Sequence, residues 1–257
     1  MSSPKPSSRA VAVYCASSTG KDPAYRNAAG SLGNALANAK RPLVYGGGST
    51  GIMGVVSGAV IDGGGEVTGV IPFAMVAAGG EGEKSTRPKV QIHLNEKGRE
   101  KIVVHSMHDR KVEMATRAGG FVGLPGGFGT FEEIMEVITW TQLGIHNKRL
   151  FLLLLPFAHL HPRYIFHTAV VLVNVLGFFD PLRSLIQRAI SEGFIRPHNE
   201  QLVVFVDGPA DLSEHPTFDW GSAALAALDG WTRSGNALFD WKVRENGGKS
   251  AGGLEAS

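Results

Sequence analysis

The chain has 257 residues, of which 43% are hydrophobic and 19% charged, and its 34 glycines clearly exceed the number expected at a usual share of about 7%. A chain with this much apolar sequence can bury a sizeable core, which excludes disorder throughout. The 25 Lys and Arg against 23 Asp and Glu leave a net charge of +2, which argues against a basic nucleic-acid-binding surface.

The two ends of the chain differ from its middle. Residues 1–9 are polar and rich in Ser and Pro, and residues 242–257 are polar and rich in Gly, so we expect both ends to be disordered and no signal peptide. Cys15 is the single cysteine, which excludes an intramolecular disulfide and a cysteine-based zinc cluster and is typical of a reducing compartment. We therefore predict a cytoplasmic protein.

Between the ends, short apolar or β-branched runs alternate with helix-like segments, which places one domain at residues 10–241. Runs with little polar alternation are expected when helices cover both faces of a parallel sheet, so the sequence predicts an α/β fold. The predicted strands are Val11–Cys15, Leu43–Tyr45, Val67–Ile71, Ile102–Val104, Phe121–Leu124, Val170–Val175 and Leu202–Val206.

Three segments carry clear helix signals. Asp22–Ala39 has an N-capping Asp and a Pro in its first turn. Thr130–Leu143 has apolar residues at i, i+3, i+4 and i+7 and a glycine where the helix would stop. Asp180–Glu192 has a Pro near its start and is followed by Gly193.

A first glycine-rich loop, Tyr45–Gly54, follows a predicted strand and opens a helix-like segment. Its Gly46, Gly48 and Gly51 match G-x-G-x-x-G, whose glycines allow a tight turn and a close approach to a phosphate at the helix N-terminus. A dinucleotide site also needs an acidic residue at the end of the next strand, but Glu66 begins that strand. The sequence therefore does not favour nicotinamide chemistry. The alternative that the loop is only a tight turn for close packing of a helix on the sheet is left open.

A second motif, Met107-His108-Asp109-Arg110-Lys111, follows the predicted strand Ile102–Val104. Arg110 and Lys111 together suit a phosphate, because Arg offers a forked donor and Lys a point charge. Alone, such a pair is more often a solvated helix face, and a lone histidine such as His108 is more often structural.

A second glycine-rich loop, Leu124–Glu133, also joins a predicted strand to a helix. Ligands of open α/β sheets bind at the carboxyl ends of the strands, so the two loops can face one pocket. Thr130 and Glu133 match T-x-x-E, and Glu133 is then the partner in a capping box. The alternative is a reaction that develops positive charge beside the anion site, as N-glycosidic hydrolysis does.

From Leu150 to Phe179 the chain is nearly uncharged, but Arg163 and two prolines interrupt it. Neither half reaches the ~20 apolar residues of a membrane span, so we predict no membrane segment. His159 and His161 form an H-x-H pattern, which is a weak metal signal, and we predict no metal site.

Taken together, three motifs resemble the LONELY GUY family of cytokinin riboside 5′-monophosphate phosphoribohydrolases, which are often labelled lysine decarboxylases. The resemblance covers about Val11 to Phe205. It implies a Rossmann-like, doubly wound α/β domain that dimerises, uses no cofactor and releases free N6-substituted adenine and ribose 5-phosphate. The motifs are Gly46-Gly47-Gly48 with Gly51 and Gly54, Met107-His108-x-Arg110-Lys111, and Pro125-Gly126-Gly127-x-Gly129-Thr130-x-x-Glu133.

By this resemblance, Arg110 and Glu133 match the catalytic pair of the family. The expected partners are an N6-substituted adenine nucleotide and a second copy of the chain, with neither nucleic acid nor membrane. The residues expected to contact the substrate are Gly47, Gly48, Glu83, Lys111, Gly126, Gly127, Phe128, Gly129, Thr130, Phe131, Glu132 and Thr139.

The motifs suggest a mechanism. We hypothesise that the loop Pro125–Thr130 and the helix N-terminus hold the 5′-phosphate, that Glu133 stabilises the ribosyl cation or orients water, and that Arg110 fixes the nucleotide. A pyridoxal decarboxylase is not supported, because no lysine stands out as the Schiff-base residue. Two other functions stay open: a general AMP phosphoribohydrolase, and a non-catalytic nucleotide or cofactor carrier of the same fold.

One segment departs from the family pattern. About 20 residues, 150–169, are extra, and the pattern resumes at Val170. We interpret them as a translated retained intron, with an extra strand or a dimer contact as alternatives.

Overall fold

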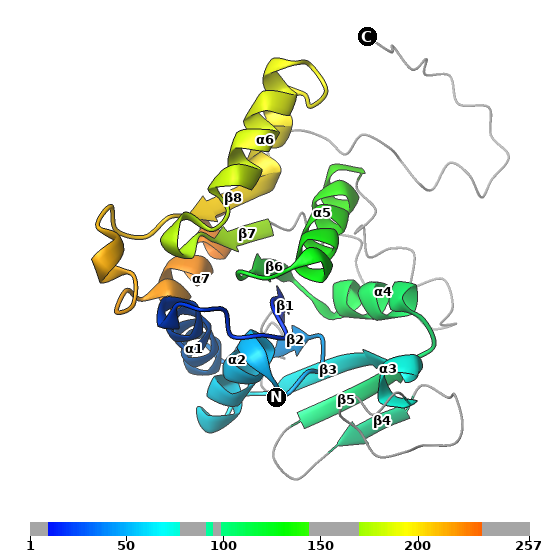
Figure 1. The fold of residues 1–257 in the computed structure, drawn as a ribbon. Helices are drawn as coiled ribbons and strands as arrows, with labels where there is room; N and C mark the ends of the chain where they lie inside the picture. The colour runs from blue at the N-terminus through cyan, green and yellow to red at the C-terminus, as the bar shows by residue number, and fades with distance from the viewer. Residues whose placement is uncertain (1–9, 78–90, 95–98, 144–169, 233–257) are drawn as a thin grey trace, which may run out of the picture.

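The computed structural model describes residues 10–77, 91–94, 99–143 and 170–232, which form a sheet with helices on both faces (Figure 1). The expectations for residues 1–9, 150–169 and 242–257, and for Glu83, lie outside the described residues.

Eight strands make up the sheet in the described part of the chain, in the order β4-β5-β3-β2-β1-β6-β7-β8. All seven predicted strands are present within a few residues of their expected bounds. The strands are β1 (Val11–Tyr14), β2 (Leu43–Tyr45), β3 (Val67–Pro72), β4 (Gln91–Leu94), β5 (Arg99–Val104), β6 (Gly120–Gly123), β7 (Val170–Val173) and β8 (Val203–Val206).

The prediction of a parallel sheet is confirmed for the seven predicted strands, and the structure adds an eighth, antiparallel strand. Strand β4 lies at the edge and pairs antiparallel with β5, and the sequence pattern did not predict it. The physical reason is the short connection of residues 95–98 between them. A link of this length joins antiparallel neighbours, whereas parallel strands need a crossover of a dozen or more residues.

Helices cover both faces of this sheet (Figure 1). α1, α2 and α7 pack over one face, and α4 and α5 over the other. The α-helices are α1 (Pro23–Asn38), α2 (Gly51–Asp62), α3 (Phe73–Ala77), α4 (Met107–Arg117), α5 (Phe128–Leu143), α6 (Asp180–Ser191) and α7 (Trp220–Gly230), and the short 3-10 helices are η2 (Val175–Gly177), η3 (Pro197–Leu202) and η4 (Leu212–Glu214).

Strand β1 shows why the sequences of these strands are continuous apolar runs. Val11 and Val13 pack in the cluster under α1, α2 and α7, whereas Ala12 and Tyr14 pack in the cluster under α4 and α5. Successive side chains of a strand point to opposite faces, and here both faces are buried.

The ends of the predicted helices largely agree with the structure. Asp22 caps α1, with its side chain accepting a hydrogen bond from the Ala24 amide at 2.8 Å. Gly193 follows α6 at a φ of +81°, a conformation that favours glycine. Helix α5 begins at Phe128, two residues earlier than predicted, so Thr130 lies inside the first turn and is not the N-cap.

The strand order reverses at β1. The chain runs outward through β2, β3 and β5 on one side of β1 and then crosses to β6, β7 and β8 on the other. The carboxyl ends of β1 and β6 therefore flank the switch point at which open α/β sheets bind ligands. Within the described residues, no helix combines the length and the apolar character that a membrane crossing requires.

Candidate active site

A cavity of about 560 Å³ opens at this switch point. Both glycine-rich loops contribute to it, which confirms the prediction that they face one pocket. The lining residues are Cys15, Ala16, Ser17, Ser18, Gly46, Gly47, Gly48, Thr50, Met53, Ile71, Met75, Met107, Arg110, Gly127, Phe128, Gly129, Thr130 and Glu133.

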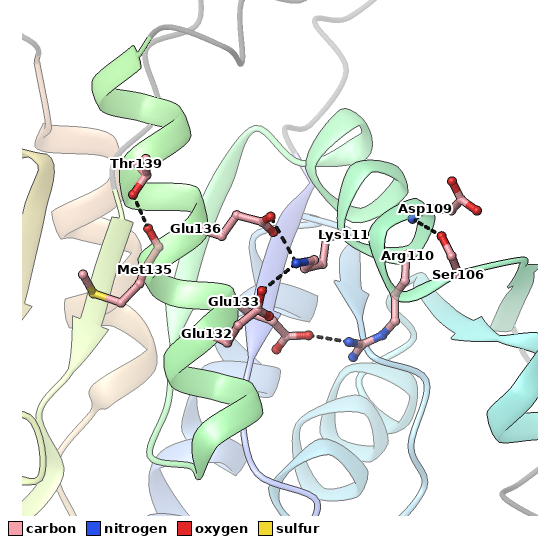
Figure 2. Close-up of polar contacts among 9 residues, drawn as sticks. All are labelled: Ser106, Asp109, Arg110, Lys111, Glu132, Glu133, Met135, Glu136 and Thr139. Carbon is pink, nitrogen blue, oxygen red and sulfur yellow. Dashed lines mark hydrogen bonds and ion pairs between the residues drawn. The ribbon is translucent and has the colours of Figure 1, made fainter.

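A buried ion pair stands in the wall of this cavity. Arg110 of α4 donates through Nη1 to Glu133 Oε1 of α5 at 2.5 Å (Figure 2). Its Nε donates to the Val70 carbonyl oxygen at 3.1 Å. The two side chains are only 10% and 8% exposed. The guanidinium is thus held from two sides, with its charge matched by one carboxylate.

The first glycine loop makes room for Arg110. A Cβ at Gly46 would lie 2.2 Å from Arg110 Nη2, so that the guanidinium would have to shift, and it would make a tight contact of 3.1 Å with Met53 Sδ. The absence of a side chain at Gly46 therefore leaves room for the Arg110 guanidinium of the neighbouring helix. This role differs from the one expected from G-x-G-x-x-G.

Burial raises the pKa of Glu133 above its usual value, although the Arg110 guanidinium opposes that rise. The nearby Glu132 carboxylate raises it further. Glu133 is also no capping partner, because α5 begins at Phe128 and the carboxylate bonds to Arg110. An ionisable group with a raised pKa in a cavity is a candidate for chemistry.

The N-terminus of α2 is occupied by the protein itself. The Ile52 amide donates to the Ser18 carbonyl and the Met53 amide to the Ala16 carbonyl, both at 3.2 Å. Gly51 has a φ of +62°, and a Cβ there would lie 2.2 Å from the Ser17 carbonyl carbon, so only glycine permits this close approach. The first glycine-rich loop thus packs against the segment that follows β1. These two α2 amides are therefore not available to an anion.

The N-terminus of α5 is open. The first amides of a helix have no intrahelical acceptor, and those of Phe128, Gly129 and Thr130 have no other partner among the described residues. No atom lies within 4 Å of a Cβ built at Gly127 or Gly129. Free amides, a helix dipole and an uncrowded backbone make this part of the cavity suited to an anion.

Part of the cavity lining is apolar. Met53 comes from α2, Ile71 from β3, Met75 from α3 and Met107 from the start of α4. Methionine side chains are unbranched and adapt to irregular apolar groups. The cavity lining therefore combines free helix amides, apolar side chains and the ion pair.

Several predicted contact residues do not line the cavity. Lys111 forms ion pairs with Glu132 and Glu136 on α5, at 2.6 and 3.1 Å. Phe131 stacks on Phe178, with ring centroids 6.2 Å apart. Thr139 donates to the Met135 carbonyl, one turn earlier in its own helix, and Gly126 packs against the Thr130 side chain.

Sequence reasoning missed Ser17, Ser18 and Thr50, whose side chains are exposed and line the cavity. The signal that would have found the serines is their position directly after the central strand β1, where the carboxyl end of the strand meets the switch point. Among the described residues, no group of three His, Cys, Asp or Glu side chains is placed to hold a metal ion. His159 and His161 lie outside these residues.

A second cavity, of about 500 Å³, lies between α1 and the segment leading into α7. Its wall is polar and includes Asn27, Asn34, Ser31 and Asp219. Asn27 and Ser31 hydrogen-bond to the backbone and side chain of the opposite wall, which joins the two elements. Without a buried charged pair, this cavity is a weaker site for chemistry.

Comparison with known proteins gives consistent results. A family described as "possible lysine decarboxylase" matches residues 53–215. The chain is 41% identical over 206 residues to the probable cytokinin riboside 5′-monophosphate phosphoribohydrolase LOGL2 of Oryza sativa subsp. japonica, covering 80% of this chain and 71% of that protein. It is 41% identical to the phosphoribohydrolase LOG7 of Arabidopsis thaliana over 202 residues, covering 79% and 78%.

Among solved structures, the molybdenum cofactor carrier protein of Chlamydomonas reinhardtii is similar with a TM-score of 0.49. The two chains are 16% identical, and the match covers 85% of this chain and 94% of that one.

Proposed function

The chain belongs to the LONELY GUY family, and from this premise we propose that it is a phosphoribohydrolase of N6-substituted adenosine 5′-monophosphates. The reaction releases the free base and ribose 5-phosphate. The observation that carries the proposal is the buried Arg110–Glu133 pair in the wall of a cavity that has free helix amides at one end.

The 5′-phosphate of the nucleotide binds at the N-terminus of α5. The amides of Phe128, Gly129 and Thr130 supply donors, and the helix dipole favours a dianion there. Because α2 amides are already bonded to the β1 loop, the second glycine loop is the phosphate site in this proposal.

The chemistry takes place beside Glu133. As the C1′–N9 bond breaks, positive charge develops on the ribose, and water adds its hydroxyl to C1′ while the base leaves protonated. The Glu133 carboxylate stabilises this charge or orients the water, and Arg110 positions the nucleotide. Glu133 must be ionised for this role, and its pKa is raised. As the pH is lowered, we therefore expect activity to be lost at a higher pH than it would be with a Glu of ordinary pKa.

The methionines of the cavity lining support an apolar substituent on the adenine N6. Met53, Met75 and Met107 offer adaptable apolar surface, and an isopentenyl-type group would be removed from water there. This surface favours N6-substituted nucleotides over plain AMP.

Lysine decarboxylation, named in the description of the matching family, is not supported by the cavity. Pyridoxal chemistry needs a lysine as the Schiff-base residue. No lysine is among the described residues that line the cavity, and Lys111 is bound to carboxylates outside it.

Incubation of the protein with N6-isopentenyl-AMP and with AMP, followed by chromatography of the free base, tests the proposal. We expect base mainly from the substituted nucleotide, and none from the Glu133→Gln variant, which keeps the side-chain shape without the charge. Equal rates on both nucleotides would indicate a general AMP hydrolase. No base from either would indicate a nucleotide-binding protein without this activity.

We also propose that the chain forms a homodimer. Large apolar side chains are exposed on α5 and after α6, including Phe128 at 91% and Phe194 at 86%, and α6 buries none of its residues in the described chain. Apolar surface of this kind marks an interaction site. Light scattering should give twice the chain mass of 27.3 kDa, and a Leu185→Asp substitution on exposed α6 should reduce it.

A cytoplasmic location completes the proposal. It is supported by the single cysteine, Cys15, which is typical of a reducing compartment. Cell fractionation with an antibody against the protein tests it, and recovery with secreted proteins would contradict it.

A further inference from the structure

Two adjacent cations of α4 point to different places. Arg110 reaches Glu133 in the cavity wall, whereas Lys111 lies between Glu132 and Glu136, at 2.6 and 3.1 Å (Figure 2). Neighbouring residues of a helix differ by about 100° in direction, so one turn of α4 supplies both contacts. Helix α5 supplies the three carboxylates that accept these contacts, and of these only Glu133 lines the cavity.

Neither helix is held mainly by the other. Helix α4 packs on β3, β1, β2 and β5, and α5 packs on β1, β6, β7 and η3. The Arg110–Glu133 distance depends on how these two separately seated helices are joined. The charged side chains of Lys111, Glu132 and Glu136 bridge them directly above the catalytic pair (Figure 2).

Two of the three side chains in this bridge are mostly shielded from water, whereas the Glu132 side chain is 52% exposed. The Lys111 side chain is 14% exposed and that of Glu136 is 21% exposed. Burial lowers the pKa of Lys111, but the hydrogen bonds that Lys111 donates to Glu132 and Glu136 outweigh it and raise the pKa above its ordinary value. Glu136 Oε2 is buried without a hydrogen-bond partner among the described residues, while Glu136 Oε1 accepts from Lys111 Nζ.

We propose that Lys111 is a positioning residue: it binds Glu132 and Glu136 outside the cavity, fixes α4 against α5, and so holds Arg110 on Glu133. This proposal rests on the proposed hydrolase function and changes the role that the family resemblance implies for Lys111. Under this proposal, Lys111 does not contact the nucleotide, and Glu136 helps Lys111 to hold the two helices together.

Two consequences separate this role from a phosphate contact. A positioning residue acts on the catalytic step, and a displacement of the reacting groups by about 1 Å can lower the rate about 100-fold. A lost contact to a phosphate would instead weaken binding of any phosphorylated ligand, by about tenfold or more.

The test compares Lys111→Met with wild type in kcat, KM and the affinity for ribose 5-phosphate measured by calorimetry. We expect kcat to fall at least tenfold, with KM and the ribose 5-phosphate affinity within about threefold. Lys111→Arg, which can bind the same carboxylates, should recover most of kcat. Arg117→Met, which removes ion pairs to Glu113 and Glu100 away from α5, is the matched control and should leave kcat unchanged.

The pH profile adds a readout that a merely structural residue would not move. The titratable and charged groups around Glu133 are Arg110 and Lys111 of α4, Glu132 and Glu136 of α5, Tyr14 of β1 and Cys15 directly after β1. Lys111 lowers the pKa of Glu133, so the acid limb of kcat should move to higher pH in Lys111→Met and return in Lys111→Arg.

Three results would overturn the proposal: a ribose 5-phosphate affinity at least tenfold weaker, an unchanged kcat, or a Lys111→Arg variant as slow as Lys111→Met. If Lys111→Met does not fold, Glu136→Gln replaces it, with the same expectation for kcat and ribose 5-phosphate. An unchanged kcat in that variant refutes the bridge. A wild-type protein that releases no base refutes the proposed function itself, and any role of Lys111 in it.

Discussion

Removal of Arg110 should destabilise the protein in a pH-dependent way. The Arg110→Met variant keeps the length of the side chain but leaves the 8% exposed Glu133 without its cation. Two charges about 4 Å apart interact by about 4 kcal/mol at an effective dielectric constant of ~20, and removing one partner of a buried pair typically costs about 3–5 kcal/mol. We expect a loss of about 3–4 kcal/mol at neutral pH.

The sign of the pH dependence follows from Glu133. Without Arg110, burial raises the pKa of Glu133 in the folded state still further above its unfolded value. The penalty is absent below the unfolded pKa, where the carboxyl is protonated in both states, and complete above the folded pKa. The cost should therefore be small near about pH 4 and full near about pH 8.

Urea and thermal unfolding at these two pH values measure the effect. At the higher pH, the midpoint temperature should fall by about 6–16 °C for a chain of this length. The double variant Arg110→Met/Glu133→Gln should recover most of the loss, because no buried charge remains. Equal losses at both pH values, or single-variant effects that add within about 0.5 kcal/mol, would refute the reasoning.

Three further outcomes follow from single contacts. Gly46→Ala should displace Arg110 and lower kcat at least tenfold in the base-release assay, whereas Gly58→Ala in α2, where no atom lies within 4 Å of the added Cβ, should leave it unchanged. Burial raises the pKa of the Cys15 thiol, so iodoacetamide should label it slowly in the folded protein and rapidly in urea. His215→Ala removes two buried hydrogen bonds to backbone groups and should cost about 2–4 kcal/mol in urea unfolding.

Local patterns were sufficient for most of the fold. Seven strands and three helices were predicted from apolar runs, the Asp22 cap and glycine or proline punctuation, because these signals depend only on neighbours in sequence. Strand β4 was missed since its four residues, Gln91–Leu94, are too few for a periodic signal and their pairing with β5 decides their conformation.

The site was predicted in part. The sequence shows two glycine-rich loops, each directly after a predicted strand, and this position predicted that both loops face one pocket. The serines Ser17 and Ser18 were missed, because nothing in their own residue types distinguishes a cavity-lining loop from any other turn. They became visible only when β1 was found at the centre of the sheet.

By itself, the sequence determined the α/β class, the two glycine loops and the presence of Arg110 and Glu133 near them. Only the tertiary structure decided which helix N-terminus stays open, because the α2 amides are satisfied by carbonyls of Ala16 and Ser18, some 35 residues away in the chain. The same holds for the carboxylate of Glu133. Its choice between a capping role and the Arg110 guanidinium depends on where α5 begins and how α4 is seated, and neither is a local property of the sequence.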